Sequence, residues 1–138
     1  MTSAQGFALV VGVDLVRVGD VAASIARFGD KYTRRLFTDG EITYCLQEPH
    51  LAGERFAARF AAKEATIKVL RLSGTDAIAW RSIEVRRAPE GWCDIILRDG
   101  AQSLADRQGI TDLAVSMSHE HEYATATVIA RRAMGERS

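Results

Sequence analysis

The strongest pattern of apolar and polar positions in this chain runs from Arg55 to Leu70, which reads RFAARFAAKEATIKVL. The stretch is rich in alanine and contains neither glycine nor proline, so it predicts a stable helix, which we expect to continue to about Leu72. At about 100° of rotation per residue, Phe56, Phe60 and Ile67 fall within about 40° of one another. We therefore expect these three side chains to form the buried stripe of the helix.

Glu64 falls on the same face of this helix, about 40° from Phe60. A carboxylate directed toward a core is costly unless a partner neutralises it. One interpretation is an ion pair with Lys68 one turn further on, which is worth only a few tenths of a kcal/mol when exposed. The other is a half-buried acid that holds a metal ion, with Lys68 beside it for a phosphate group.

Residues 7–16, FALVVGVDLV, form an apolar run that predicts a strand buried on both faces. Asp14 comes near the end of this run, shortly after Gly12, and taken alone it is typical of a turn or cap residue. The run is too short to cross a bilayer, and no basic segment precedes it, so it does not indicate a signal peptide.

The remaining helices and strands follow from cap and turn residues. Asp20 is expected to cap a short helix that ends at Gly29. Thr38 and Glu41 have the spacing of a capping box, which begins a helix that continues to about residue 47. The other predicted elements are a hairpin over 80–87 and 92–97, a short helix from 99 or 100 to 109, and a second hairpin over 113–117 and 123–130. This order predicts an α+β fold, in which helices, including one long central helix, pack on a mostly antiparallel sheet.

Composition narrows the class of protein. A chain of 138 residues predicts a single domain, 1–138, and its 47% hydrophobic and 26% charged residues are ordinary for a globular protein. The formal net charge is zero, which does not suggest a nucleic-acid or membrane partner. Cys45 and Cys93 lack a metal-binding spacing and are predicted to be free thiols of a cytoplasmic protein.

Two polar clusters invite a functional interpretation. His119 and His121, in the connection SHEHE at 118–122, have the chemistry of metal ligands, but without a third ligand a polar hairpin turn is favoured over zinc. A group of basic residues follows the first predicted helix and indicates either a solvated face or a docking site for an acidic partner. Its members are Arg27, Lys31, Arg34 and Arg35.

Three stretches in combination resemble a known family. GVDLV around Asp14, RFAAKEATIK from Arg59 to Lys68, and VSMSHEHEYATATVI from Val115 are similar to the holo-acyl-carrier-protein synthases, the small single-unit class of 4′-phosphopantetheinyl transferases. Their order and spacing match from about Leu9 to Arg131. The resemblance implies the fold of that family and its reaction, which serves fatty acid biosynthesis. The 4′-phosphopantetheine arm of coenzyme A moves to a serine of an apo acyl carrier protein, adenosine 3′,5′-bisphosphate leaves, and Mg²⁺ is required.

The resemblance also implies roles for individual residues. Asp14 and Glu64 would be the metal-binding carboxylates, and Glu64 and Lys68 the catalytic pair, with Lys68 on the phosphates. Mg²⁺ usually takes one or two protein carboxylates and fills its other positions with water and phosphate, so two acids suffice. Phosphoryl transfer needs mostly positioning and charge neutralisation. The serine proton would pass to Glu64 or to a water held by the metal. Further contacts to the phosphates or ribose of coenzyme A would come from Arg59, Lys63, Lys68 and His119.

The family pattern extends to partners and assembly. It implies a homotrimer with active sites between subunits, and carrier docking at the first helix. The docking residues would be Arg17, Arg27, Lys31, Arg34 and Arg35. Two departures stand out: Arg17 and Asp20 occupy places where relatives carry an acid and an arginine, and Trp92 and Cys93 follow Gly91 where a Gly-x-Pro turn is common. The competing functions are a catalytically silent scaffold subunit and a small zinc module using both histidines.

Overall fold

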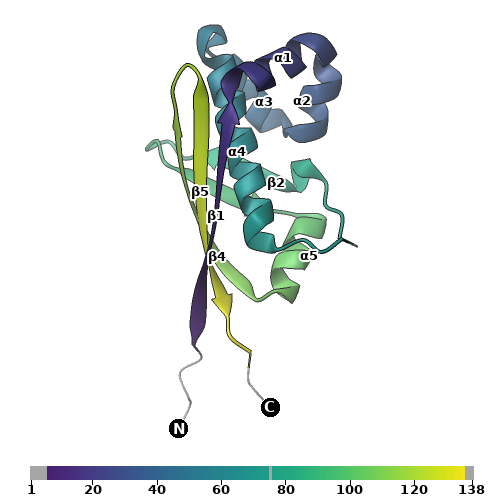
Figure 1. Cartoon of the computed structure of the whole chain (residues 1–138), viewed down its shortest axis with the longest axis vertical. Helices are drawn as coiled ribbons and strands as arrows, with labels where there is room; N and C mark the ends of the chain where they lie inside the picture. Colours follow the sequence, from purple (N-terminus) through teal and green to yellow (C-terminus); the bar gives the residue numbers. More distant parts are fainter. Residues whose placement is uncertain (1–5, 75, 136–138) are drawn as a thin grey trace.

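A long three-stranded antiparallel sheet runs the length of the molecule (Figure 1). The computed structural model describes residues 6–74 and 76–135. The strands lie in the order β1 (Phe7–Arg17), β5 (Tyr123–Ala133) and β4 (Ile110–His119), and β4 and β5 form the predicted second hairpin. The register places Asp14 opposite Ala126 of the central strand. The predicted α+β class is confirmed.

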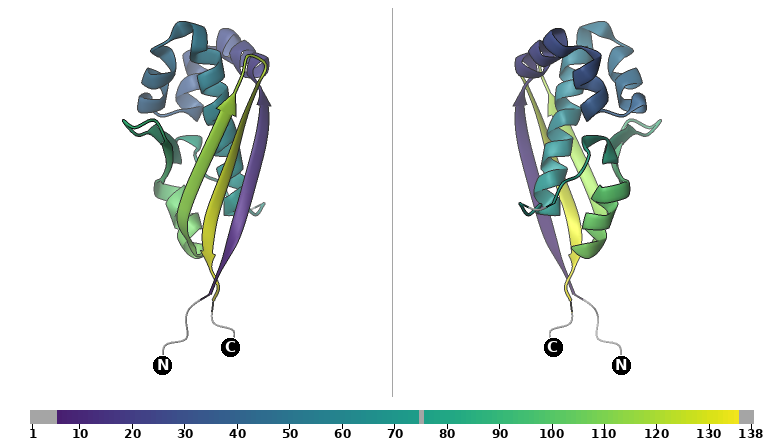
Figure 2. Two further views of the ribbon diagram at one scale, coloured as in Figure 1. Left: turned by 90° about the vertical axis from the view of Figure 1, so that its left-hand side faces the viewer. Right: turned by 90° about the vertical axis from the view of Figure 1, so that its right-hand side faces the viewer.

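Helices gather at one end of the sheet and along one of its faces, while the termini lie at the opposite end (Figures 1 and 2). They are α1 (Val18–Phe28), α2 (Asp30–Leu36), α3 (Asp39–Leu46), the 3-10 turn η1 (Pro49–Leu51) and the long α4 (Ala52–Leu70). The strand β3 (Cys93–Leu97) and the helix α5 (Asp99–Arg107) lie beside β4. The strand β2 (Ile83–Arg87) pairs with β3 in a hairpin, and η2 (Trp80–Ser82) precedes β2 and contacts α2 and α5. Over the described ranges, no helix is long and apolar enough to cross a membrane.

Local cap signals set the start of α3 and the end of α1. Thr38 and Glu41 form the predicted capping box: the Thr38 hydroxyl accepts from the Glu41 amide at 3.2 Å, and the Glu41 carboxylate accepts from the Thr38 amide at 2.8 Å. Gly29 ends α1 with a φ of 57°, a conformation that glycine adopts without strain. Two predictions are wrong: Asp20 lies in the first turn of α1 rather than at its cap, and the short α2 was not expected.

The predicted buried stripe of α4 is only partly correct. Phe56 is buried, but Phe60 and Ile67 are half-buried, and the face that packs on the sheet consists of small side chains. These are Ala57, Ala58, Ala61, Ala62 and Ala65. Small side chains allow a close approach, so the helix lies nearer the strands than bulky residues permit.

Strand β1 is buried on one face only, which corrects the expectation of a strand buried on both. Val10 and Gly12 face α4 and are buried. The alternate positions point to the other face of the sheet, which none of the described helices covers (Figure 2). Leu9, Val11, Val13 and Leu15 are 56% to 68% exposed there.

Candidate functional site

Gly12 is the point where α4 crosses β1, and this crossing positions three of the predicted site residues. A Cβ atom at Gly12 would lie 2.2 Å from the carbonyl oxygen of Ala65 and 3.2 Å from the Cβ of Lys68, so a larger residue does not fit. Asp14 lies two positions further along the same face of β1. The crossing therefore brings Asp14 to the part of α4 that carries Glu64 and Lys68.

Lys68 pairs with the strand rather than with its helical neighbour. Its Nζ atom lies 3.3 Å from Oδ1 of Asp14 and donates a hydrogen bond of 2.8 Å to the carbonyl oxygen of Val13. Among the residues that the structure describes, no ion pair joins Lys68 to Glu64. The structure therefore does not contain the ion pair that the first interpretation of these two residues assumed. Asp14 itself is neither a turn nor a cap residue, because it lies inside β1.

The electrostatics at this crossing suit a cation. Partial burial raises the pKa of Glu64, the negative charge of Asp14 raises it further, and Lys68 only partly offsets these effects. Two carboxylates thus lie close enough to repel each other. Carboxylate oxygens are the ligands that Mg²⁺ prefers, and two of them leave room for water and phosphate. The residues present therefore fit such an ion.

The two histidines of the β4–β5 connection lie against an acidic side chain of α4. His119 and His121 both face Glu54 of α4, with Nδ1 atoms 2.9 Å and 3.7 Å from its carboxylate oxygens. In the described parts of the chain, no cluster of three or more histidine, cysteine or acidic side chains forms a metal site. The connection is the polar hairpin turn that the sequence favoured.

A polar cavity of about 360 Å³ opens between α4, β4 and the β2–β3 hairpin. Three guanidinium groups surround the ring of Tyr44 in its wall: those of Arg55, Arg59 and Arg87 lie 4.4, 4.2 and 5.6 Å from the ring centroid. Arg59 is only 4% exposed, and its Nε atom has no hydrogen-bond partner among the described residues. His119 also lines the cavity. Arginine-rich, partly desolvated cavities are suited to phosphate groups.

Sequence reasoning missed most of this cavity. It selected Arg59 and His119, but not Tyr44, Arg55 or Arg87. The signal for Arg55 was present, since it lies one turn before Arg59 on the same side of α4. Tyr44 and Arg87 come from other elements, and nothing in their local sequence indicates that they meet.

The predicted site residues fall on opposite sides of α4. Arg59 and Lys68 are nine residues apart, which is about 180° around a helix. The cavity with Arg59 and His119 is therefore separated by the helix from Asp14 and Glu64.

Lys63 belongs to neither group, which corrects its prediction as a phosphate contact. Its side chain is fully buried, and its Nζ atom is paired with Glu41 at 2.8 Å. Glu41 lies 22 positions before Lys63 in the sequence and on another helix, so no local pattern indicated this pair.

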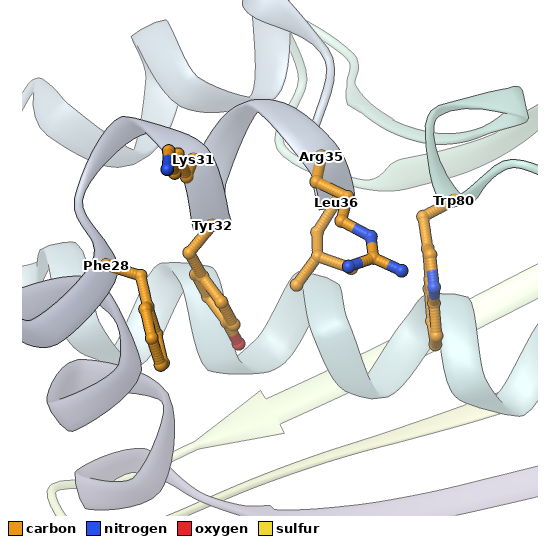
Figure 3. A pocket seen from close by; sticks show the side chains of 6 residues that line it. All are labelled: Phe28, Lys31, Tyr32, Arg35, Leu36 and Trp80. Carbon is orange, nitrogen blue, oxygen red and sulfur yellow. The ribbon is translucent and has the colours of Figure 1, made fainter.

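An apolar hollow lies beside α2, and two of the basic residues near the first helix line it (Figure 3). Lys31 and Arg35 lie at this hollow of about 390 Å³, whose other lining side chains are Phe28, Tyr32, Leu36 and Trp80. Arg27 stacks over Phe28 at 5.0 Å, and Arg34 lies in the last turn of α2. Arg17 is separate from this group: it lies over the ring of Tyr123 and lines another cavity together with Asp20.

Comparisons with known proteins cover nearly the whole chain. The family model for the 4′-phosphopantetheinyl transferase superfamily matches residues 10–128. The chain is 40% identical over 121 residues to the holo-[acyl-carrier-protein] synthase of Koribacter versatilis, which covers 88% of this chain and 96% of that protein. It is 42% identical over 125 residues to the protein of the same name from Gloeobacter violaceus, a match that covers 90% of this chain and 93% of that protein.

Solved structures show the same similarity in three dimensions. The coenzyme A complex of ACPS from Chronobacterium ammoniagenes has a TM-score of 0.79 and 30% identity, covering 91% of this chain and 98% of that chain. The holo-[acyl-carrier-protein] synthase of Helicobacter pylori in complex with coenzyme A has a TM-score of 0.75 and 26% identity, and the match covers 88% of this chain and 99% of that chain. The stretch that the family model matches, residues 10–128, spans the positions of Asp14, Glu64, Lys68 and His119.

Proposed function

Because this chain belongs to the 4′-phosphopantetheinyl transferase superfamily, we propose that it is a holo-acyl-carrier-protein synthase. It moves the 4′-phosphopantetheine arm of coenzyme A to a serine of an apo carrier protein, in a Mg²⁺-dependent reaction that releases adenosine 3′,5′-bisphosphate. The observation that carries the proposal is the crossing at Gly12, which gathers two carboxylates and a lysine from distant parts of the chain. These are the groups that phosphoryl transfer uses for positioning and charge neutralisation.

Each group at the crossing has a role in this proposal. Asp14 and Glu64 would hold Mg²⁺, which when bound neutralises charge on the pyrophosphate of coenzyme A. Lys68 is half-exposed and contacts a single carboxylate, so its ammonium group can turn to the phosphate. The serine hydroxyl must lose a proton, and Glu64, whose pKa is raised by burial and by Asp14, or a water beside it, would receive that proton.

The arginine-rich cavity would bind the adenosine 3′,5′-bisphosphate end of coenzyme A. Arg59 is buried with an unpartnered Nε atom, and a phosphate oxygen would satisfy that donor. His119 lines the same cavity, and its Nδ1 atom is 2.9 Å from Glu54, which orients the ring. Lys63, which is paired in the core, is not part of this phosphate site.

The two halves of the site would meet between subunits of a homotrimer. One chain presents Glu64 and Arg59 on different sides of α4, so a single copy does not close the site. The exposed face of the sheet supports an assembly, because contiguous apolar surface of this kind is typical of protein interfaces. It carries Phe7, Leu9, Val11, Val13, Leu15 and Ile129, all at least 44% exposed.

The carrier protein would dock on the helical end of the molecule. Lys31 and Arg35 stand at the rim of the apolar hollow of Figure 3, an arrangement that suits an acidic partner with one projecting apolar side chain. Arg27 and Arg34 extend the same basic area, and Arg17 adds charge nearer Asp20. Cys45 and Cys93 are free thiols, as predicted, which fits a reaction in the reducing cytoplasm.

Incubation of the pure protein with coenzyme A, Mg²⁺ and a panel of apo carriers tests the proposal. We expect at least one carrier to gain the mass of one phosphopantetheine, and expect no gain when Mg²⁺ is chelated. A protein that binds coenzyme A tightly but modifies no carrier in the panel would favour the scaffold alternative. Tight zinc binding without coenzyme A would favour the metal module.

A further inference from the structure

Lys63 and Glu41 form an ion pair in the core, away from both halves of the proposed site. The side chains of both residues are fully buried, and Lys63 Nζ lies 2.8 Å from Glu41 Oε1. Burial lowers the pKa of Lys63, although the negative charge of Glu41 opposes this shift. Pairs of this kind add little stability compared with apolar side chains of the same shape, so their presence needs another explanation.

The pair joins three elements through directional hydrogen bonds. Lys63 on α4 donates to the carbonyl oxygen of Trp80, at 3.1 Å, and to that of Ile83 at the start of β2. Glu41 on α3 accepts from the backbone amide of Val85 in β2, at 2.9 Å. The two side chains therefore link α3, α4 and β2 directly.

Each of these three elements carries at least one wall residue of the arginine-rich cavity. Tyr44 follows Glu41 by one turn of α3, Arg59 precedes Lys63 by one turn of α4, and Arg87 follows Val85 on β2. The three wall residues touch: the Arg59 guanidinium lies 4.2 Å from the Tyr44 ring centroid, and Arg87 Nη1 donates to the Tyr44 hydroxyl at 3.1 Å. A shift of any one element would separate them.

We propose that Glu41 and Lys63 are positioning residues for the coenzyme A cavity, holding α3, α4 and β2 so that Tyr44, Arg59 and Arg87 meet. The inference rests on the proposed function, since it takes this cavity to bind the adenosine 3′,5′-bisphosphate end of coenzyme A. The residues of the proposed metal site are not part of the Glu41–Lys63 pair. Asp14 lies on β1, and the Glu64 side chain leaves α4 about 100° away from that of Lys63.

The test separates positioning from stability with a paired replacement. Glu41→Gln leaves the buried Lys63 charge unpaired, and Lys63→Met leaves the buried carboxylate unpaired, so both lower the melting temperature. The double variant Glu41→Leu/Lys63→Met removes both charges and is expected to recover most of the melting temperature. Val69→Ala, a core change on α4 that leaves the pair intact, serves as the matched destabilised control.

Calorimetric titration of each full-length protein with adenosine 3′,5′-bisphosphate gives the decisive measurement. We expect the dissociation constant to rise about tenfold in the double variant despite its recovered stability, because well-placed charged hydrogen bonds to a ligand are worth about this much. The KM for coenzyme A should rise similarly, with kcat at saturation within about twofold of the parent. Val69→Ala should bind as the parent does.

Two results would count against the inference in different ways. If the double variant binds the bisphosphate as tightly as the parent, the pair serves stability alone and the positioning role is wrong. If the parent itself does not bind the bisphosphate, the assignment of the cavity to coenzyme A is wrong, and the premise falls with it.

Discussion

At the scale of single residues, the proposed metal site depends on two carboxylates that repel each other in the structure. Glu64→Gln and Asp14→Asn each keep the shape of the side chain but remove an anionic ligand. We predict a loss of turnover on the order of 10²-fold or more in each variant, with the fold intact. The Glu64→Gln protein should melt no lower than the parent in metal-free buffer, because the two effects that raise the pKa of Glu64, the burial of its charge and the repulsion from Asp14, are gone. Near-normal turnover at limiting Mg²⁺ would refute the metal assignment.

Lys68 tests the distinction between a structural ion pair and a phosphate contact. Its pairing with Asp14 is half-exposed and adds at most about 1 kcal/mol to stability. Lys68→Ala should therefore leave the melting temperature nearly unchanged while turnover drops roughly 10²-fold. Lys68→Arg, which keeps the charge, is the control and should retain more activity. Equal turnover for Lys68→Ala and parent would leave Lys68 with a structural role only.

At the scale of elements, the crossing of α4 over β1 decides whether the proposed catalytic groups meet. Gly12→Ala places a methyl group against the carbonyl oxygen of Ala65, and the backbone must move to relieve the clash. We expect the free energy of unfolding to fall by about 1 to 3 kcal/mol, the usual cost of overpacking, and turnover to fall with it. Gly19→Ala in α1, where a Cβ meets nothing within 4 Å, is the control and should be neutral or slightly stabilising. Equal stability of Gly12→Ala and parent would contradict this account of the crossing.

The contact between β2 and the start of α3 gives a prediction about pH. Burial alone would raise the pKa of Glu84, but hydrogen bonds from Thr38 and Arg98 outweigh it and hold the pKa below its ordinary value of 4.5. A carboxyl group with a lowered pKa stabilises the fold above pH 4.5, and this contribution is lost as the pH falls through the folded-state pKa.

Glu84→Gln should therefore lower the free energy of unfolding at pH 7 by about 1 to 3 kcal/mol, the usual worth of charged hydrogen bonds. The difference from the parent should shrink as urea titrations are repeated at pH values below 4.5. The exposed Glu90→Gln should match the parent throughout. A difference that persists unchanged to pH 3 would show that the charge of Glu84 is not its source.

At the scale of the whole molecule, the placement of Arg59 and Glu64 on different sides of α4 makes the proposed reaction depend on assembly. We expect light scattering to give a homotrimer, and we expect two inactive variants to restore each other. Co-refolding of Glu64→Gln with Arg59→Met in equal amounts should recover about a quarter of the parental turnover. Each proposed site takes Glu64 from one subunit and Arg59 from its neighbour, and random mixing leaves both residues intact in about a quarter of the sites. Each variant refolded alone is the control. A fully active monomer, or no recovery in a mixed trimer, would show that each chain holds a complete site.

The sequence by itself determined what depends on near neighbours. The capping box of Thr38 and Glu41, the end of α1 at Gly29 and the turn between β4 and β5 are interactions over a few positions, and local patterns predict them. The motif strings likewise named Asp14, Glu64, Lys68 and His119, because their order along the chain is itself a signature. The helical period also placed Glu64 on a partly buried face of α4.

Only the tertiary structure decided the partners that lie far apart in sequence. Lys63 is a charged residue beside the predicted stripe, and its burial became favourable only when the fold brought Glu41 and two backbone carbonyls around it. The pairing of Lys68 with Asp14 and the grouping of three arginines around Tyr44 also join separate elements. Such contacts depend on how closely α4 approaches the sheet, which follows from packing of the whole core and not from the pattern of any one segment.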